Sequence, residues 1–364
     1  MDMDALTILT INSGSSSLKA SLFPKDGSRK NFRYDHLEGQ HSAFEKLLEE
    51  IGEMPDMIGH RFVHGGDIVE PARVVDEAER TRLRDLIPLA PLHLPGNLLG
   101  LDLCSNFGVP QIACFDTAFH ATMPEISKRL PIPDRFGLRR YGFHGLNYAH
   151  ISKQLPALLG DLAYGTIIAA HLGSGASLCL MKNLQSIDTT MGYSPAGGIV
   201  MGTRSGDLDP GVMLELSRLM THEELARIVY HEMGLYALSK GESHEMSNLL
   251  GSKSAQSRFA VDYFCNSVRA AIGAFAAKAG GIDALVFSGG IGEHAPQIRE
   301  KICSPLQFMG FWLDDAANKG TGMKISGRDS RPVLIVSADE ETVIRDLCLD
   351  FTSPRAASAP QRAR

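Results

Sequence analysis

The sequence lacks several features that would place it in a class at once. No apolar run approaches the roughly 20 residues needed to cross a bilayer, and the first four residues, Met-Asp-Met-Asp, lack the basic start of a signal peptide. Basic residues are not in excess, since 36 Lys and Arg against 42 Asp and Glu give a net charge of −6. We therefore expect neither a nucleic acid nor a membrane as a partner, because such surfaces usually attract a basic excess.

The cysteines also form no recognisable pattern. All six are scattered, and no two of them make a C-x-x-C pair. This usage is typical of a reducing cytoplasm and favours free buried thiols over disulfides or a metal site. With 44% hydrophobic and 21% charged residues, the composition is that of a globular protein. The length of 364 residues predicts two domains.

The sequence contains one pattern three times: an apolar run that leads into glycines and small polar residues. Residues 7–23 place an Asn, a Gly and three consecutive Ser between two apolar runs, and residues 166–181 repeat the form around HLGSG. Both stretches predict a β-hairpin with small polar residues at its tip. Residues 285–294 give a third version, a strand that ends in glycines before a predicted helix.

Such tips suggest phosphate binding. Small residues let backbone N–H groups approach an anion, and a nest of these donors can hold phosphate. Lys19 adds a positive charge beside the first tip. The first stretch is not a Walker A loop, which needs a second Gly before the Lys and a helix after it, and a polar tip without a ligand is the alternative. The two hairpins lie too far apart for a solenoid repeat. They predict two related domains, each offering a phosphate loop to a shared cleft that holds a nucleotide.

Polar residues also follow predicted strands. Arg61 ends the strand at residues 56–63 and precedes two glycines, where a guanidinium can hold a carboxylate or phosphate; a structural ion pair is the alternative. His60 and His64 have a spacing that would suit a metal on a helix, but their neighbours favour a strand end. Asp116 follows a later apolar strand, where α/β proteins bind ligands; it could instead cap a helix.

The rest of the chain alternates helices with strands, which predicts an α/β class. Residues 188–211 form a long glycine-rich connection with one basic residue, Arg204, and long loops of this kind tend to be functional. His144 stands between glycines, where a histidine is more often structural than catalytic. We predict a last strand at residues 332–336 and a disordered tail at 353–364. Capped helices are predicted at 42–53, at 76–87, from 210, from 222 and at 254–279.

The chain resembles the acetate kinases from end to end. Five motifs carry the resemblance, in the family's order and at similar spacings: NSGSSSLK at 12–19, GHRFVHGG at 59–66, FDTAFH at 115–120, YGFHG at 141–145 and MGTRSGDLDPG at 201–211. The family belongs to the acetate and sugar kinase, Hsc70 and actin superfamily. The resemblance therefore implies an α/β fold of two duplicated actin-like (ribonuclease H-like) domains with an interdomain cleft, at residues 1–120 plus 342–364 and at 121–341.

The same resemblance implies a reaction. Acetate kinases transfer a phosphoryl group between ATP and acetate or propionate, with ADP and the acyl phosphate as products and Mg²⁺ or Mn²⁺ as the metal ion. The resemblance also implies a cytoplasmic homodimer. The implied catalytic residues are Asp116, His144 and Arg204. The implied metal positions are Asn12 and Glu340, whose oxygen atoms suit a hard cation.

Further implied roles concern the substrates. Arg61 would hold the carboxylate or acyl phosphate, beside a small apolar pocket for the acyl methyl group made by Val63, Leu92, Phe143 and Pro195. The residues implied in phosphate and nucleotide binding are Ser15, Ser17, Lys19, His171, Leu172, Gly173, Ser174, Gly175, Glu245, Met246, Ser247, Gly290, Ile291, Gly292, Glu293 and His294.

The chemistry of the reaction agrees with these roles. Phosphoryl transfer needs charge neutralisation and an in-line acceptor, with little covalent participation by the protein. In the family, the residue matching Arg204 steadies the charge on the phosphoryl group in flight, and that matching His144 assists. A carboxylate acceptor carries no proton at neutral pH, so no general base is needed. We therefore expect Asp116 to orient Arg61 or a Mg²⁺-bound water.

Three departures from the family pattern lie at the nucleoside end. Ser174 and His294 each stand where most members have Asn, and Ser247 replaces the Arg of an Asp-x-Arg motif. One alternative is therefore the same chemistry with another donor, such as GTP or pyrophosphate. A nucleotide-gated switch without phosphoryl transfer is a further alternative, which the presence of Arg61, Asp116, His144 and Arg204 disfavours. A sugar kinase is disfavoured because Arg61 beside a small apolar pocket suits a short carboxylate.

Overall fold

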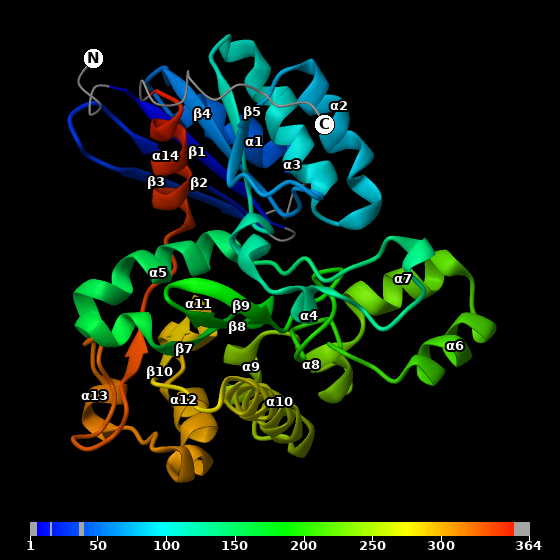
Figure 1. The fold of residues 1–364 in the computed structure, drawn as a ribbon. Helices are drawn as coiled ribbons and strands as arrows, with labels where there is room; N and C mark the ends of the chain where they lie inside the picture. The colour runs from blue at the N-terminus through cyan, green and yellow to red at the C-terminus, as the bar shows by residue number, and fades with distance from the viewer. Residues whose placement is uncertain (1–5, 15–16, 36–39, 353–364) are drawn as a thin grey trace. The chain divides into compact units, whose positions relative to one another are not determined.

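The structure is a computed structural model that describes residues 6–14, 17–35 and 40–352. It divides into two compact units (Figure 1). Unit 1 comprises Met1–Phe119, Gly145–His150 and Asp339–Arg364, and unit 2 comprises His120–His144 and Ile151–Ala338. The predicted tail at 353–364 lies outside the described residues.

Unit 1 is built on a mixed six-stranded sheet in the order β3-β2-β1-β4-β6-β5. The predicted first hairpin is confirmed, because β1 and β2 pair antiparallel, whereas β1, β4 and β6 run parallel to one another. The carboxyl ends of parallel strands meet at one edge of a sheet, which is where ligands bind in α/β proteins. The strand bounds are Ile8–Ser13 for β1, Ser17–Phe23 for β2, Lys30–Asp35 for β3, Met57–Phe62 for β4, Ala72–Val74 for β5 and Gln111–Phe115 for β6.

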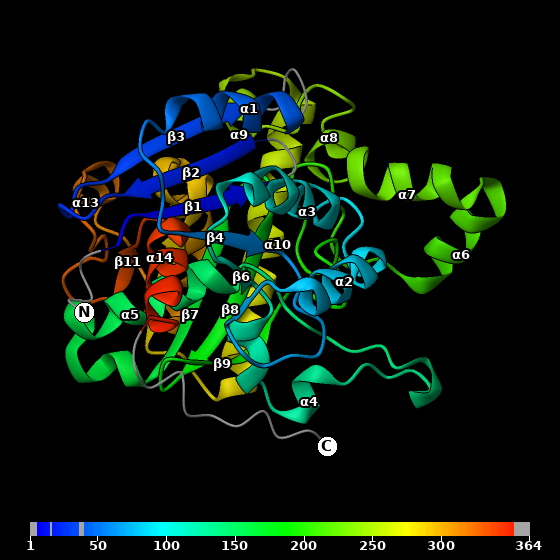
Figure 2. The same cartoon turned by 90° about the horizontal axis from the view of Figure 1, so that it is seen from above.

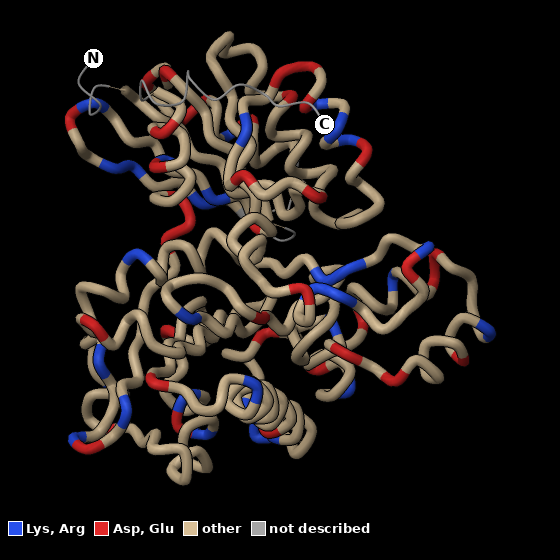
Figure 3. Tube along the Cα trace, in the orientation of Figure 1, with Lys and Arg blue, Asp and Glu red and all other residues tan. Residues whose placement is uncertain are grey.

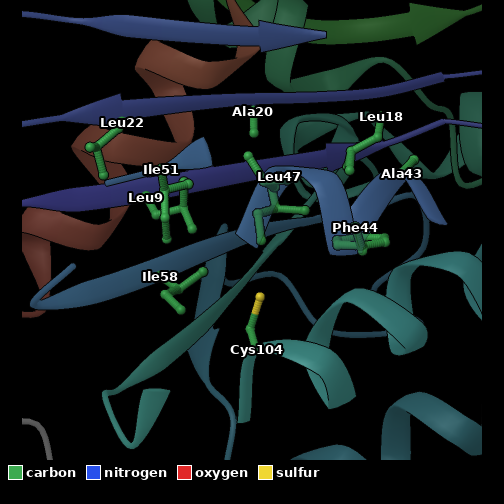
Figure 4. Close-up of a cluster of buried hydrophobic side chains, with 11 residues drawn as sticks. Leu9, Leu18, Ala20, Leu22, Ala43, Phe44, Leu47, Ile51, Ile58 and Cys104 are labelled. Atoms are coloured by element: carbon green, nitrogen blue, oxygen red, sulfur yellow. The ribbon is translucent and has the colours of Figure 1, made fainter. Parts of the chain in front are cut away.

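Helices cover both faces of this sheet, because successive side chains of a strand point to opposite faces. Leu9 packs with Phe44 and Leu47 of α1 (Figure 4). Its neighbour Ile8 packs on the other face with Ile344 of α14. Figure 2 shows the ribbon of α14 beside the strands of this sheet. The helices of this unit are α1 (Gln40–Glu50), α2 (Glu77–Asp85), α3 (Leu94–Leu103) and α14 (Glu340–Asp350).

The predicted helix caps of unit 1 have different outcomes. Asp76 caps α2, and its carboxylate accepts a hydrogen bond from the backbone N–H of Glu79 at 2.8 Å, as predicted. The capping box expected at Ser42 is wrong, because α1 already begins at Gln40 and ends at Glu50. Ser42 therefore lies inside the first turn, where a hydroxyl can bond locally without marking the boundary.

Unit 2 contains a mixed five-stranded sheet in the order β11-β10-β7-β8-β9. The predicted second hairpin is confirmed: β7 and β8 pair antiparallel, and β10 runs parallel to both β7 and β11. A hairpin followed by parallel strands thus recurs in both units, which confirms the predicted duplicated α/β class. The strand bounds are Thr166–Leu172 for β7, Ala176–Lys182 for β8, Gln185–Thr189 for β9, Ala284–Ser288 for β10 and Val333–Ile335 for β11.

The predicted helix starts of unit 2 are confirmed at Asp209, Thr221 and Ser254, whose side chains cap α6, α7 and α10. Gly280, with φ 72°, ends α10 in the left-handed region that favours glycine. The remaining helix bounds are α4 Glu125–Lys128, α5 Gly145–Leu159 (which begins in unit 1), α6 Pro210–Leu219, α7 His222–His231, α8 Gly234–Leu238, α9 Met246–Gly251, α10 Ala255–Ala279, α11 Gly289–His294, α12 Pro296–Cys303 and α13 Asp315–Lys319.

Three general predictions can be compared with this structure. All six cysteines are buried and free. Within residues 6–14, 17–35 and 40–352, no helix combines the length and apolar character needed to cross a membrane. Acidic and basic residues are interspersed along both units (Figure 3).

Candidate active site

The carboxyl edge of the unit 1 sheet holds a polar cluster made of Asn12, Arg61, Asp116, Glu340 and Glu341. Arg61 donates from Nε and Nη2 to Oδ2 of Asp116, at 3.0 and 2.6 Å, and from Nη1 to Oδ1 of Asn12 at 3.0 Å. Asn12, Arg61 and Asp116 come from the ends of β1, β4 and β6, the three parallel strands. The topology of the sheet thus brings together residues that lie far apart in the sequence.

The start of α14 completes this unit 1 cluster. The amide nitrogen of Asn12 donates to Glu340 Oε2 at 2.7 Å and to Glu341 Oε1 at 3.2 Å. Asp339 caps the helix by accepting from the backbone N–H of Thr342, and Arg29 holds the Asp339 carboxylate at 2.9 and 3.0 Å. Both glutamates therefore occupy the first turn of an anchored helix.

Asp116 has partners that correspond to both roles considered for it. Its Oδ2 accepts from Arg61, and its Oδ1 accepts from the backbone N–H of Leu146 in the first turn of α5, at 3.4 Å. The side chain is fully buried. Burial raises the pKa of Asp116, Arg61 lowers it, and the nearby Glu340 carboxylate raises it again, so that the pKa lies above its ordinary value.

The unit 1 cluster carries more negative than positive charge. Asp116 and Glu340 share the guanidinium of Arg61, and Glu341 has a long ion pair with Arg29 at 3.8 Å. Burial together with Glu340 still raises the pKa of Glu341. Burial by itself lowers the pKa of Arg61, but the carboxylates of Asp116 and Glu340 raise it above its ordinary value, so Arg61 stays charged. Crowded carboxylates of this kind are stabilised by an additional cation.

The donor set fits Mg²⁺ of the hydrated type. No three His, Cys, Asp or Glu side chains in the described part of the chain are arranged as a metal-binding group. Mg²⁺, however, keeps several waters and is usually held by one or two carboxylates plus substrate phosphates. Glu340 and Glu341, both hydrogen-bonded to the same Asn12 amide, supply such oxygens in a locally acidic setting.

A second polar cluster lies within unit 2 and contains His144, His171, Ser177, Gly175 and Arg204. Nδ1 of His144 lies 2.8 Å from Ser177 Oγ, and the imidazole stacks on that of His171 with ring centroids 4.2 Å apart. A Cβ atom on Gly175 would lie 2.9 Å from Nη2 of Arg204 and 3.3 Å from Nε2 of His144. The tip of the β7–β8 hairpin is therefore in close contact with both basic side chains, and a Cβ at residue 175 would displace the end of the Arg204 side chain.

Arg204 is a partly buried cation for which no acidic partner is found among the described residues. Its Nη1 donates to the carbonyl oxygen of Pro195 at 2.7 Å. Burial lowers the pKa of Arg204 to about 10, and no Asp or Glu that the structure describes forms an ion pair with it. A guanidinium held in this way gains stability when an anion binds, because a buried charge without a counterion is costly.

Three stretches implied in nucleotide binding lie close together in unit 2. Ser288 pairs with His171, and a Cβ on Gly289 would lie 2.8 Å from the carbonyl oxygen of Leu172, so residues 289–294 begin beside 171–175. The backbone N–H of Gly202 donates to the Ser174 carbonyl at 3.2 Å. A Cβ on Gly202 would lie 3.1 Å from the carbonyl oxygen of His244, which adjoins residues 245–247. Glu293 accepts from the backbone N–H of Ala338 at 3.0 Å.

The first phosphate loop is described only in part. Ser15 lies outside the described residues, whereas Ser17 and Lys19 lie on β2, where Ser17 is half-buried and Lys19 is exposed. Asn97 stabilises the backbone beside this loop, since its amide donates to the Ser13 carbonyl at 3.0 Å and accepts from the Val63 N–H at 3.2 Å.

The four apolar residues implied in acyl binding occupy both units. Val63 and Leu92 belong to unit 1, and Phe143 and Pro195 belong to unit 2. Val63, Phe143 and Pro195 are buried, and Leu92 is half-buried. A surface hollow of about 740 Å³ lies elsewhere, beside α4 at residues 125–133.

The histidines considered as metal ligands have other partners. Nε2 of His60 lies 2.7 Å from Oε1 of Gln111, and Nδ1 of His64 accepts from the backbone N–H of Gly66 at 2.9 Å. Burial lowers the pKa of His60 to about 4. His60 lies on β4, so the predicted strand is confirmed.

Sequence reasoning missed Glu341 and Ser177 of these clusters. It also missed Asn97 and His120, which contact the backbone next to cluster residues, at the carbonyl oxygens of Ser13 and Phe143. Glu341 had a usable signal, because it follows Glu340 at the start of a helix that the sequence predicts. Ser177 also lies in a recognised hairpin, four residues after its tip begins. Asn97 and His120 act through backbone atoms of distant segments, and nothing in their local sequence indicates this.

Comparison with known proteins identifies a family that matches most of the chain. Residues 30–346 match the model of the Acetokinase family. The acetate kinase of Nitrobacter hamburgensis is 37% identical over an alignment that covers 98% of this chain and 99% of that protein. The acetate kinase of Caldanaerobacter subterraneus is 38% identical, with 85% and 82% covered.

Solved structures agree with these relatives. A propionate kinase from Francisella tularensis superposes with a TM-score of 0.85 at 29% identity, covering 94% of this chain and 98% of that one. The acetate kinase of Porphyromonas gingivalis gives a TM-score of 0.82 at 31% identity, covering 96% and 100%. The chain therefore belongs to the acetokinase family and has its duplicated, actin-like α/β fold.

Proposed function

We propose that this protein catalyses the reversible transfer of the γ-phosphoryl group of ATP to acetate or propionate, giving the acyl phosphate and ADP. Membership of the acetokinase family supports the reaction. The observation that carries it is that the chain has two arginines in opposite electrostatic environments. Arg61 is fixed by a carboxylate, whereas Arg204 has no acidic partner among the described residues and is suited to an anion.

Arg61 is proposed to hold the carboxylate or acyl phosphate. A guanidinium has five N–H donors, and the contacts to Asp116 and Asn12 use three of them. The remaining two, one on each terminal nitrogen, form a fork that matches a carboxylate. Asp116 then has the role of orienting Arg61, and no base is required because the acceptor is already ionised.

Arg204 and His144 are proposed to stabilise the charge of the phosphoryl group during transfer. Both side chains lie against Gly175, so their nitrogen atoms face the same hairpin tip. Preorganised donors in a site of low polarity stabilise developing charge strongly, because they need no reorganisation during the reaction. We propose direct in-line transfer to the carboxylate, a route that needs no nucleophilic side chain.

Asn12, Glu340 and Glu341 are proposed to hold Mg²⁺ through its waters. The bound ion would neutralise charge on the phosphate oxygens. The observation in favour is the surplus of carboxylates around the Asn12 amide. Asn12 and Glu340 also contact Arg61, and Glu341 contacts Asn12. The three residues therefore fix the acyl-binding side chain whether or not the metal is bound.

ATP is proposed to bind at the three stretches 171–175, 245–247 and 290–294, with its phosphates also approached by Ser15, Ser17 and Lys19. The adjacency of these stretches within unit 2 supports a common nucleotide site.

We also propose a homodimer, supported by the exposed aromatic pair Phe259 and Tyr263 on α10. A cytoplasmic location is proposed as well, supported by six free thiols. Analytical ultracentrifugation would test the dimer.

A matrix of donors and acceptors tests the proposed function. Formation of the phosphorylated product, which is acetyl phosphate, propionyl phosphate or glucose phosphate, is measured with ATP, GTP or pyrophosphate as donor and acetate, propionate or glucose as acceptor. We expect ATP with acetate or propionate to give the highest kcat/KM. Nucleotide hydrolysis that is indifferent to the carboxylate would instead indicate a switch protein, and would refute the proposal.

A further inference from the structure

We propose that Ser177 and His120 are positioning residues for His144: Ser177 fixes its imidazole ring and His120 fixes the backbone that carries it. This inference rests on the proposed function, because it assumes that His144 assists phosphoryl transfer. All three residues belong to unit 2. Neither Ser177 nor His120 is required to touch a substrate.

The ring of His144 is held through one of its two nitrogen atoms. Ser177 is fully buried on β8, and its Oγ lies 2.8 Å from Nδ1 of His144. The ring also stacks on His171 at an interplanar angle of 28°. Rotation about the last side-chain bond of a histidine has a broad, roughly two-fold profile. Stacking alone permits a flipped ring, whereas the hydrogen bond selects the orientation in which Nδ1 faces Ser177 and Nε2 is the ring nitrogen beside Gly175.

The backbone of His144 has a conformation that its surroundings must impose. With φ 57° and ψ 25°, His144 lies in the left-handed region, which residues other than glycine seldom adopt. The carbonyl oxygen of the preceding residue, Phe143, lies 2.9 Å from Nε2 of His120. A carbonyl can only accept, so Nε2 of His120 carries a proton and donates it to this hydrogen bond.

The other nitrogen of His120 fixes its own ring. Nδ1 lies 2.8 Å from Ser186 Oγ on β9, and because Nε2 is the donor in a neutral imidazole, Nδ1 accepts from this hydroxyl. Burial lowers the pKa of His120 to about 4, so the ring is neutral at neutral pH. His120 therefore anchors the segment before His144 to the unit 2 sheet.

Close packing makes this anchor specific. Gly142 has φ 80°, and a Cβ placed on it would lie 2.6 Å from two ring carbons of His120 and 2.6 Å from a methyl group of Thr189. The imidazole thus lies directly against the backbone of residue 142. Two contacts with the segment 142–143, one packed and one hydrogen-bonded, fix the backbone that leads into His144, the N-cap residue of α5.

The two positioning residues can be tested by matched substitutions. Ser177→Ala removes only the hydroxyl, and Ser257→Ala is its control, since Ser257 is equally buried in unit 2 and its hydroxyl bonds Glu242 at 2.6 Å. His120→Gln retains a donor at the distance of Nε2, whereas His120→Asn retains only a group near Nδ1. Steady-state kcat and KM for acetate and ATP are measured for each variant, alone and combined with His144→Ala, together with the thermal midpoint.

We expect Ser177→Ala and His120→Asn to lower kcat about ten-fold or more, as for supporting residues of other sites, with KM changed less than about three-fold. His120→Gln should recover most of this loss, and Ser257→Ala should leave kcat within about two-fold. In the His144→Ala background, neither substitution should lower kcat further. An equal loss of kcat with and without His144 would overturn the inference, as would full activity of Ser177→Ala and His120→Asn.

Failure of the underlying function gives a different pattern. If His144→Ala itself keeps the wild-type kcat, the proposed role of His144 is wrong and the inference falls with it. If His144→Ala is impaired but Ser177→Ala and His120→Asn are not, only the inference is wrong. Should one of the two positioning variants fail to fold, the other still decides, because each is compared within its own double-mutant cycle.

Discussion

Replacing Arg204 should reduce the rate of phosphoryl transfer far more than substrate affinity. Its guanidinium is charged in a partly buried place where no acidic side chain of the described chain pairs with it. A pKa lowered from 12.5 to about 10 corresponds to roughly 3 kcal/mol, at about 1.4 kcal/mol per pKa unit. This is the order of free energy that an incoming anionic charge can recover.

The size of the expected loss follows from that value. If the phosphoryl group gains about 3 kcal/mol from Arg204 mainly in the transition state, Arg204→Ala lowers kcat by roughly 10²- to 10³-fold. KM for ATP and for acetate should stay within a few-fold. Arg204→Lys keeps the charge but not the planar fork, and should give an intermediate kcat.

The assay follows acetyl phosphate as its hydroxamate at saturating substrates. Arg218→Ala is the control for loss of a positive charge, since Arg218 is exposed and paired with Glu215. The thermal midpoint of Arg204→Ala should not fall, because the substitution removes an unpaired charge. A raised KM with unchanged kcat would refute the assigned role, and a large loss of stability would refute the electrostatic argument.

Three further predictions concern the other residues. Arg61→Ala should raise KM for acetate at least ten-fold while KM for ATP changes little; an unchanged acetate affinity in steady-state kinetics would contradict the fork. Glu340→Gln should raise the Mg²⁺ concentration needed for half-maximal activity, and for half-maximal thermal stabilisation with ADP, by about ten-fold; identical Mg²⁺ titrations would exclude the proposed metal position. His60 and His120 have pKa values of about 4 in the folded protein, against an ordinary value of 6.5. Between these pH values the unfolded chain binds more protons, so the free energy of unfolding should fall as the pH drops from 6.5 to 4, by up to about 3 kcal/mol for each histidine. Urea denaturation at pH 7 and pH 4.5 measures this loss, which His120→Gln should halve; a loss of the same size in that variant would show that His120 does not contribute.

Local signals in the sequence foretold the elements of the fold well. The two hairpins around 7–23 and 166–181 are determined by apolar alternation and by small residues at their tips, both of which are visible without long-range contacts. The caps at Thr221 and Ser254 depend on a hydrogen bond within three residues. The start of α1 was wrong because Ser42 has the same local pattern inside a helix as at its boundary.

The site was predictable only through the resemblance to a family. Asn12 and Glu340 are hydrogen-bonded although they lie 328 positions apart, and no local pattern indicates such a contact. Arg61 was recognised as a strand-end residue, but its partner Asp116 was left with two possible roles, and it has contacts of both kinds. Ser177 was missed because a serine in a strand has no distinctive local pattern, and its partner His144 lies 33 positions earlier in the sequence.

The position of α14 in unit 1 affects how the protein is made. Val343, Ile344 and Cys348 of this helix cover one face of a sheet whose central strands are synthesised more than 200 residues earlier. On the ribosome, residues 120–338 emerge between the two parts, so unit 2 is complete before unit 1 can close. The first strands of the chain are therefore uncovered on this face until α14 has been synthesised. A translation product that stops before residue 339 exposes that apolar face to chaperones and proteases.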